Sequence, residues 1–248
     1  MPPIGSVSRK RRAAVVSPLR SCVRFAAHNS PVVDDLLARV RAETDSILVG
    51  YSGGKDSAAV LSKCLEVFKT VVPFFMFIAP GLPMFERHFE RVRAAYGVEV
   101  IQTAHPTVSV ALKRGLYCKP RWSGPVLKQV DVETTIRKRT GIDWIAYGHR
   151  ASDSIPRNAM LRRFQGFDPK GRRVYPIWDW SMPKVWGYTR ARKLPLVPQI
   201  GGRRTSGVGL TVKSIIELHA ASRDDYEALR RMYPDIEAVV ARAHRGEV

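Results

Sequence analysis

The stretch SILVGYSGGKDSAAVLSKCLEVF, residues 46–68, decides the fold of this chain. Its apolar residues 47–49 predict a buried strand, and apolar residues recur at helical spacing from 61 to 68. A turn rich in glycine and serine separates the two elements. The first N–H groups of a helix have no internal partner, and the helix dipole is positive at that end. Since Gly53 and Gly54 leave no Cβ between the backbone and an incoming phosphate, the turn predicts an anion site.

Two common nucleotide-binding motifs do not fit this turn. The nucleoside-triphosphate loop G-x-x-x-x-G-K-[ST], aligned on Gly54 and Lys55, requires glycine at position 49 and serine or threonine at position 56. The chain has Val49 and Asp56 there. The dinucleotide pattern G-x-G-x-x-G is not met either. Neither motif therefore explains the turn.

Residues 52–57, Ser-Gly-Gly-Lys-Asp-Ser, match the S-G-G-x-D-S motif of the PP-loop ATP pyrophosphatases. The chain most resembles the branch that contains the phosphoadenosine phosphosulfate (PAPS) reductases and the small subunit of ATP sulfurylase. The resemblance implies that the protein binds ATP, or the sulfonucleotides PAPS or adenosine phosphosulfate (APS), together with Mg²⁺. It also implies that Asp56 orders the loop or holds Mg²⁺. The residues expected to hold the phosphates are Ser52, Gly53, Gly54, Lys55 and Ser57.

A second segment, residues 148–157, concentrates arginines, an acid and hydroxyls where a predicted strand ends and a helix begins. Arginine forks onto phosphate or sulfate oxygens in a way that lysine cannot. The same family branch carries a similar G-x-R-x-x-[ED]-S-x-x-R segment on its nucleotide-facing side. The alternative interpretation is a capped helix start with solvated arginines. By the resemblance, the anion-site candidates are Arg150, Asp153, Ser154 and Arg157.

A third segment, residues 175–188, is similar to a Y-P-[IL]-x-x-W-x-x-x-x-V-x-x-Y element that follows the sheet in this branch. Aromatic residues at such spacing form a core more often than a site, so we expect them to close the pocket by packing. With this segment the resemblance extends from about residue 46 to about residue 200.

The resemblance implies an enzyme, either a PP-loop ATP pyrophosphatase that acts as an adenylyltransferase or a PAPS reductase-like enzyme. In the first case an acceptor oxygen attacks the α-phosphorus of ATP and expels pyrophosphate. Arg150 and Arg157 would contact the α-phosphate or the acceptor, and Lys55 and Asp56 complete the expected catalytic set. Two alternatives stay open. One is a PAPS- or APS-binding enzyme whose thiol comes from another protein, and the other is a non-catalytic nucleic-acid-binding protein on the same fold.

Two features depart from the family pattern. Reductases of this family keep a cysteine in an E-C-G-x-H element near the carboxyl terminus, and its thiolate attacks the sulfur of the sulfonucleotide. The last cysteine of this chain is Cys118, so thiol-dependent sulfate reduction in its usual form is not expected. The acidic residue that many relatives carry after the second strand is also missing, because residues 78–81 read Ile-Ala-Pro-Gly.

Charge and cysteine content narrow the ligands and partners. The chain has 248 residues and a formal net charge of +19, which predicts a polyanionic partner or strongly anionic ligands without distinguishing them. The resemblance implies an adenine nucleotide, and a nucleic acid stays open. A partner subunit also stays open. Cys22, Cys64 and Cys118 lie far apart with no C-x-x-C pair, so we expect no disulfide framework, no zinc and no iron–sulfur cluster. Three cysteines without a disulfide framework fit a reducing, cytoplasmic setting. No apolar run is long enough for a membrane span.

The order of elements predicts an α/β fold with a doubly wound, mostly parallel sheet of about five strands and a small C-terminal helical extension. Such a fold is typical of the adenine nucleotide α-hydrolase-like proteins that the chain resembles, and its ligands bind beyond the carboxyl ends of the strands. We divide the chain into a basic flexible tail (1–30), the nucleotide-binding domain (31–170) and a closing segment with C-terminal helices (171–248).

Several single residues complete the prediction. Pro73 lies near the start of the strand expected at 71–78, which either begins after it or tolerates a lost ladder bond. A helix is expected from Pro83, with His88 on its polar, solvated side. His105 and His149 follow predicted strands, from whose ends they could face the pocket.

Overall fold

The structure, a computed structural model, describes residues 31–200 and 208–247. The expected basic tail, residues 1–30, lies outside these ranges. The strands are β1 (Ser46–Gly50), β2 (Thr70–Phe77), β3 (Ile101–Ala104), β4 (Ile145–Tyr147), β5 (Phe167–Asp168) and β6 (Arg173–Val174). The helices are α1 (Pro31–Arg41), α2 (Lys55–Val67), α3 (Pro83–Tyr96), α4 (Pro106–Arg114), α5 (Gln129–Thr140), α6 (Ile155–Phe164), α7 (Met182–Ala191), α8 (Val212–Ala221), α9 (Arg223–Met232) and α10 (Ile236–His244), with a short 3₁₀ helix η1 (Ala151–Asp153).

Within the described ranges the strands form one six-stranded sheet in the order β3-β2-β1-β4-β6-β5. All neighbouring pairs are parallel except β5 and β6, which pair antiparallel. The predicted mostly parallel α/β fold is therefore confirmed. The sheet exceeds the expected five strands because the short β5–β6 pair is added at the edge beyond β4.

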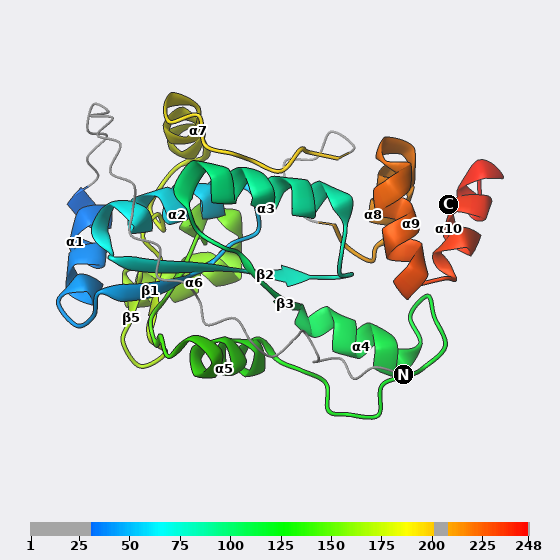
Figure 1. Ribbon diagram of the computed structural model, residues 1–248, viewed down its shortest axis with the longest axis horizontal. Helices are drawn as coiled ribbons and strands as arrows, with labels where there is room; N and C mark the ends of the chain where they lie inside the picture. Colours follow the sequence, from blue (N-terminus) through cyan, green and yellow to red (C-terminus); the bar gives the residue numbers. More distant parts are fainter. Residues whose placement is uncertain (1–30, 201–207, 248) are drawn as a thin grey trace.

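Helices cover both faces of the sheet, as Figure 1 shows for α3 on one side and α5 on the other. Successive residues of a strand point to opposite faces. Ile47 and Val49 accordingly belong to the larger apolar cluster, with residues of α1, α2 and α3, while Leu48 joins a second cluster with residues of α5 and α6. All three side chains are buried, which is why β1 reads as an unbroken apolar run rather than as an alternating one.

Local sequence signals set several element ends where they were expected. Helix α3 begins at Pro83 and ends before Gly97, which has a φ of 69° and supplies the left-handed C-cap. Strand β2 begins at Thr70 and includes Pro73. Strand β3 pairs with β2 only from Phe74 onward, so Pro73 lies where β1 is the only described neighbour. The missing N–H of Pro73 therefore removes no bond to β3.

Other boundaries differ from the prediction. Residues 98–102 predict a strand from the sequence, whereas β3 begins at Ile101, three residues later, and α4 follows it without having been predicted. Helices α8, α9 and α10 form the expected C-terminal extension, at the opposite end of the long axis from α1 (Figure 1). Their buried residues, among them Leu218 and Ile236, join the same apolar cluster as α2. None of the helices in the described ranges is long and apolar enough to cross a membrane.

The sheet reverses its winding direction between β1 and β4. The chain passes from β1 through α2 to β2 on one side, whereas β4 lies on the other side of β1 and leads toward β6. Gly50 and Tyr147, the last residues of the two strands, are paired. The loops that follow β1 and β4 therefore separate at a topological switch point, where ligands of open α/β sheets bind.

The contact between these two loops generates a testable prediction. A Cβ on Gly148 would lie 2.8 Å from the carbonyl carbon of Asp56 and 2.9 Å from the nitrogen of Ser57, and backbone atoms cannot move aside cheaply. We expect Gly148→Ala to lower the free energy of unfolding by about 1–3 kcal/mol. Gly187→Ala is the control, because an added Cβ meets nothing within 4 Å in α7. It should raise stability by about 0.5–1 kcal/mol in urea denaturation, and equal effects would contradict the assigned contact.

Candidate functional site

The PP-loop (residues 52–57) follows the carboxyl end of β1 and runs into the first turn of α2. Gly53 has a φ of 74°, in the left-handed region. A Cβ at this position would lie 2.3 Å from Cγ2 of Val197 and 3.2 Å from Nε2 of His88. Both the backbone conformation and the close packing behind the loop therefore require glycine.

Backbone N–H groups in the first turn of α2 are open to an anion. No side chain of the described residues caps the helix at Gly54. The hydroxyl of Ser57 is turned inward, since it accepts a hydrogen bond from the N–H of Ser52 (3.1 Å) and donates to the carbonyl of Gly54 (3.0 Å). The first N–H groups of a helix have no intrahelical acceptor. At half-buried Lys55 and Asp56 these groups can bind a phosphate.

Asp56 joins two cations beside this turn. Its Oδ2 lies 2.6 Å from Nζ of Lys55, and its Oδ1 lies 2.8 Å from Nε of Arg150. The side chain of Lys55 is only 9% exposed, and its ammonium lies 5.9 Å from the centre of the Trp186 ring. These contacts support the ordering role expected of Asp56 more than the metal-binding one, because two cations already neutralise the carboxylate.

Arg150 lies deeper than the sequence predicted. The residue is 2% exposed. Besides Asp56, its guanidinium contacts Oδ1 of Asp153 at 2.7 Å and donates to the carbonyl of Trp180 at 3.4 Å. A buried guanidinium is tolerated only when charges and acceptors compensate its lost hydration. In this arrangement Arg150 therefore joins the PP-loop to the loop after β4, and its direct contact with an anion stays a prediction.

The other candidate residues of the segment 148–157 have different roles. The Arg157 side chain is 46% exposed and lies 3.2 Å from Oδ2 of Asp153, so it can reach a ligand at the edge of the sheet. Ser154 is the N-cap of α6, and its hydroxyl accepts a hydrogen bond from the N–H of Arg157. For Ser154 the structure supports the capping alternative. Asp153 positions both arginines.

His88 lies behind the PP-loop, and its place at the candidate site was not predicted from the sequence. It is fully buried, and its Nε2 lies 2.7 Å from the hydroxyl of Tyr51. The expectation of a solvated His88 is wrong because the residue follows Phe85 by three positions and precedes Val92 by four, which places it on the buried stripe of α3. Burial lowers the pKa of His88 to about 4, so the imidazole is neutral near pH 7.

The other two candidate histidines differ in their surroundings. His149 is half-buried and stacks on Tyr147 and Tyr175, with ring centres 5.3 and 5.6 Å away. Burial and, second, the charge of Arg157 lower the pKa of His149 to about 4. His105 is the N-cap of α4, and its ring accepts a hydrogen bond from the N–H of Thr107. His149 therefore lies at the candidate site, whereas His105 has a capping role.

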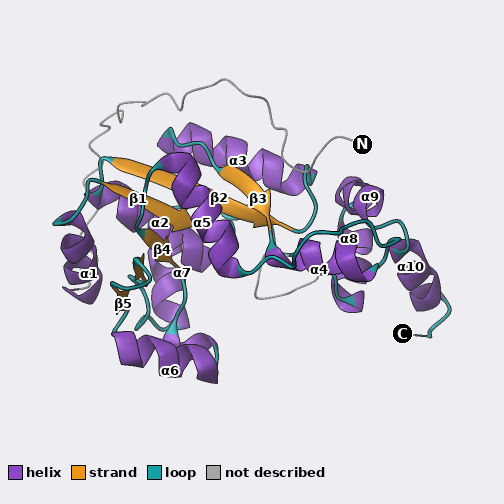
Figure 2. Ribbon diagram, turned by 90° about the horizontal axis from the view of Figure 1, so that it is seen from below, coloured by secondary structure: helices purple, strands orange, loops and turns teal. Residues whose placement is uncertain are grey.

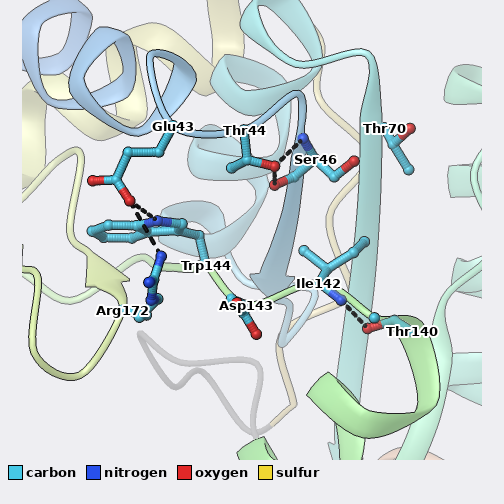
Figure 3. A pocket seen from close by; sticks show the side chains of 10 residues that line it. Glu43, Thr44, Ser46, Thr70, Thr140, Ile142, Asp143, Trp144 and Arg172 are labelled. Carbon is cyan, nitrogen blue, oxygen red and sulfur yellow. Dashed lines mark hydrogen bonds and ion pairs between the residues drawn. The ribbon is translucent and has the colours of Figure 1, made fainter.

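A hollow of about 420 Å³ lies at the opposite edge of the sheet (Figure 3). Ser46 and Thr70, which begin β1 and β2, line it. In the close-up Glu43 points toward Trp144 and Arg172, and its Oε2 accepts hydrogen bonds from both at 3.0 and 3.2 Å. Because this is the amino end of the strands, the hollow does not belong to the PP-loop site.

The two buried histidines predict a pH dependence of stability. Their pKa is about 4 in the folded protein against an ordinary value of 6.5. Between these values the unfolded chain binds more protons, so the contribution of these histidines to stability should fall as pH decreases from 6.5 to 4 and change no further below pH 4. We expect a loss on the order of 2 kcal/mol per histidine. The measurement is the melting temperature as a function of pH. His88→Gln and His149→Gln should each reduce the slope of this plot between pH 4 and 6.5, and an unchanged slope would contradict the lowered pKa of the replaced histidine.

Comparison with known proteins supports the resemblance seen in the motifs. Residues 46–201 match the phosphoadenosine phosphosulfate reductase domain family. Comparison with curated protein sequences found no significant match. Among solved structures the chain is similar to the U34-tRNA thiolase NcsA from Methanococcus maripaludis with its 4Fe–4S cluster. That similarity has a TM-score of 0.44 and 15% identity, and it covers 83% of this chain and 79% of the other.

The sequence predicts no iron–sulfur cluster for this chain, whereas the matched structure is described with one. The residues described here do not supply an evident ligand set. No group of three or more His, Cys, Asp or Glu side chains in the described part of the chain could hold a metal ion. Cys64 and Cys118 are both buried.

The family match covers the elements that form the candidate site. It runs from β1 to the segment after α7 and therefore includes the PP-loop, residues 148–157 and the aromatic segment. The switch point between β1 and β4 brings the first two of these together. The chain therefore belongs to the phosphoadenosine phosphosulfate reductase domain family and has its PP-loop, adenine nucleotide α-hydrolase-like fold.

Proposed function

We propose that this protein is a PP-loop enzyme that binds ATP and cleaves it between the α- and β-phosphates, transferring AMP to an acceptor. One observation carries the proposal. No side chain of the described residues caps the first turn of α2, which lies at the switch point of the sheet, where its N–H groups can hold a diphosphate. The family match supports a nucleotide as the ligand.

The proposed reaction is a displacement at phosphorus. A nucleophilic oxygen of the acceptor attacks the α-phosphorus, the bond from that phosphorus to the bridging oxygen breaks, and pyrophosphate leaves with the electron pair. The acceptor proton passes to water. Backbone N–H groups of the PP-loop and the ammonium of Lys55 stabilise the negative charge on pyrophosphate. Since Lys55 is paired with Asp56 in the free protein, it exchanges that carboxylate for a phosphate oxygen on binding.

The two arginines have different parts in this proposal. Arg157 is exposed at the edge of the site and contacts the α-phosphate or the acceptor. Arg150 is a positioning residue, because its buried guanidinium holds Asp56 and Asp153 at fixed places. Asp56 in turn orders the PP-loop.

A PAPS- or APS-binding function is the second candidate, and the family match favours it. Reduction of a sulfonucleotide requires a thiolate nucleophile. Burial raises the pKa of the Cys64 thiol and that of the Cys118 thiol, so neither is suited to that role. Under this alternative the thiol comes from another protein. Thermal-shift measurements with ATP, AMP, APS and PAPS separate the two ligands, because the bound nucleotide raises the melting temperature.

Replacement of Lys55 tests the reaction. Lys55→Ala should reduce pyrophosphate release from ATP by about 100-fold or more, because a charge that stabilises the leaving group is lost. Lys213→Ala is the matched control, since Lys213 also lies in the first turn of a helix but its side chain is 80% exposed on α8. The measurement is pyrophosphate formed in the presence of candidate acceptors and a divalent cation. Release of phosphate instead of pyrophosphate, or full activity of Lys55→Ala, would overturn the proposal.

The roles of Arg150 and Arg157 can be distinguished by the effect of each replacement on the free energy of unfolding. Arg150→Ala leaves two carboxylates without their buried partner and should lower the free energy of unfolding by about 3–5 kcal/mol. Arg157→Ala should change stability by less than about 0.5 kcal/mol because the side chain is exposed. It should instead raise KM for ATP or lower kcat for pyrophosphate release. A stable Arg150→Ala variant with the same kinetic defect as Arg157→Ala would show that both arginines contact substrate.

A further inference from the structure

Helix α6 is mostly uncovered. Of its ten residues, all of which the structure describes, Leu161 is the only buried one. Ile155, at the start of the helix, is 89% exposed, the largest value among the exposed large hydrophobic residues of the described part. Most helices of globular proteins are stabilised by packing of an apolar face. The outer face of α6 is therefore available to a partner, and Figure 2 shows the helix at the lower edge of the molecule, away from α8–α10.

The layer formed by α5, α6 and the β5–β6 turn is strongly basic. Residues 128–173 contain eleven lysines and arginines against five acids. Exposed cations of this layer for which no carboxylate of the described residues lies within ion-pair distance are Lys128, Lys138, Arg139, Arg162, Arg163 and Lys170. We call these six residues together with Ile155 the α5–α6 surface.

Most acids of the layer are used internally. Glu133 is buried and pairs with Arg173, which also lies 3.5 Å from Asp168. Asp153 holds the arginines of the site, and Asp131 accepts the N–H of Lys128 at the start of α5. Four of the five acids therefore compensate groups of the fold itself. The charge of the α5–α6 surface remains without a local counterpart.

The C-terminal helices, by contrast, have a nearly balanced charge. Residues 212–247 contain six lysines and arginines against seven acids. Arg230, for example, pairs with both Glu227 and Glu237. Cations in the last turn of a helix also complement its dipole, an effect worth about 0.3–1 kcal/mol. That effect does not account for Lys128 and Ile155, which lie at the opposite ends of α5 and α6.

We infer that the α5–α6 surface binds a nucleic acid and leads it to the PP-loop. Spaced cations can pair with the phosphodiester backbone, and the exposed side chain of Ile155 at the start of α6 can contact an unpaired base. Helix α6 begins directly after Arg150 and Asp153, so a strand lying along it reaches the candidate site. The inference deepens the proposed function by naming the acceptor class and rests on it only in that respect.

Charge reversal on α6 tests the surface. The assay is fluorescence anisotropy of labelled 20-nucleotide single-stranded RNA and DNA with the full chain, without ATP, over a range of salt concentrations. Arg162→Glu/Arg163→Glu should weaken binding by at least about tenfold and lower the slope of log Kd against log salt by about two. Arg231→Glu/Arg242→Glu is the matched control, because these exposed arginines lie in the last turns of α9 and α10.

The affinity of the control variant should fall by less than about threefold. Its net charge changes by the same amount, but the replaced arginines do not belong to the α5–α6 surface. Equal loss in both variants would mean that only net charge matters and would overturn the inference. Loss of binding to anionic lipid vesicles with unchanged nucleic-acid binding would overturn it as well. The six cations of residues 1–33 are present in every variant, so the difference between variants reports the helices.

A second variant separates apolar contact from charge. Ile155→Ser should weaken binding by about threefold without changing the salt slope, because no charge is removed. Its melting temperature should be unchanged, since the side chain is 89% exposed. The two proposals fail separately. Nucleic-acid binding without pyrophosphate release under any condition would support binding by the α5–α6 surface and overturn the proposed reaction. Pyrophosphate release without nucleic-acid binding by α6 would support the reaction and overturn the proposed binding surface.

Discussion

The ion pair between Asp56 and buried Arg150 is the interaction on which the rest of the site depends. It joins the first turn of α2, which follows β1, to the loop that follows β4. The close approach of Gly148 to the backbone of Asp56 keeps these two segments in contact. Because Arg150 is buried, loss of either carboxylate partner would leave an uncompensated charge. The geometry of the PP-loop is thus coupled to the stability of the sheet's switch point.

The PP-loop is packed against side chains on one side and is open to a ligand on the other. His88, Tyr51 and Val197 pack behind Gly53, and the N–H of Val197 donates to its carbonyl at 2.9 Å. A neutral His88 introduces no charge that would compete with Lys55 for the phosphates. In front, uncapped N–H groups and Arg157 face the edge of the sheet. Prearranged donors of this kind stabilise developing charge without reorganisation, which is the requirement for phosphoryl chemistry.

Much of the fold was predictable because local signals agreed with the tertiary structure. Helix α3 begins at Pro83, as expected, and ends before Gly97, and Ser181 caps α7. The start of β3 and helix α4 were less predictable, since residues 98–104 are weakly apolar and only pairing with β2 selects which of them form a strand. For the site, the sequence identified the two loops, but their partners came from distant elements. Burial of His88 was readable from its spacing, whereas the pairing of Arg150 with two carboxylates was not.

The sequence by itself determined the PP-loop, the order of elements from β1 to β3, the family and the excess of positive charge, because each depends on neighbouring residues or on composition. Tertiary structure alone decided which arginine is buried and which is exposed, and it gave Ser154 its capping role. It also decided where the charge lies, since the acids of residues 128–173 are mostly consumed inside the fold. The physical reason is that a charged group's role depends on its partners and its hydration, and both are set by residues far away in the chain.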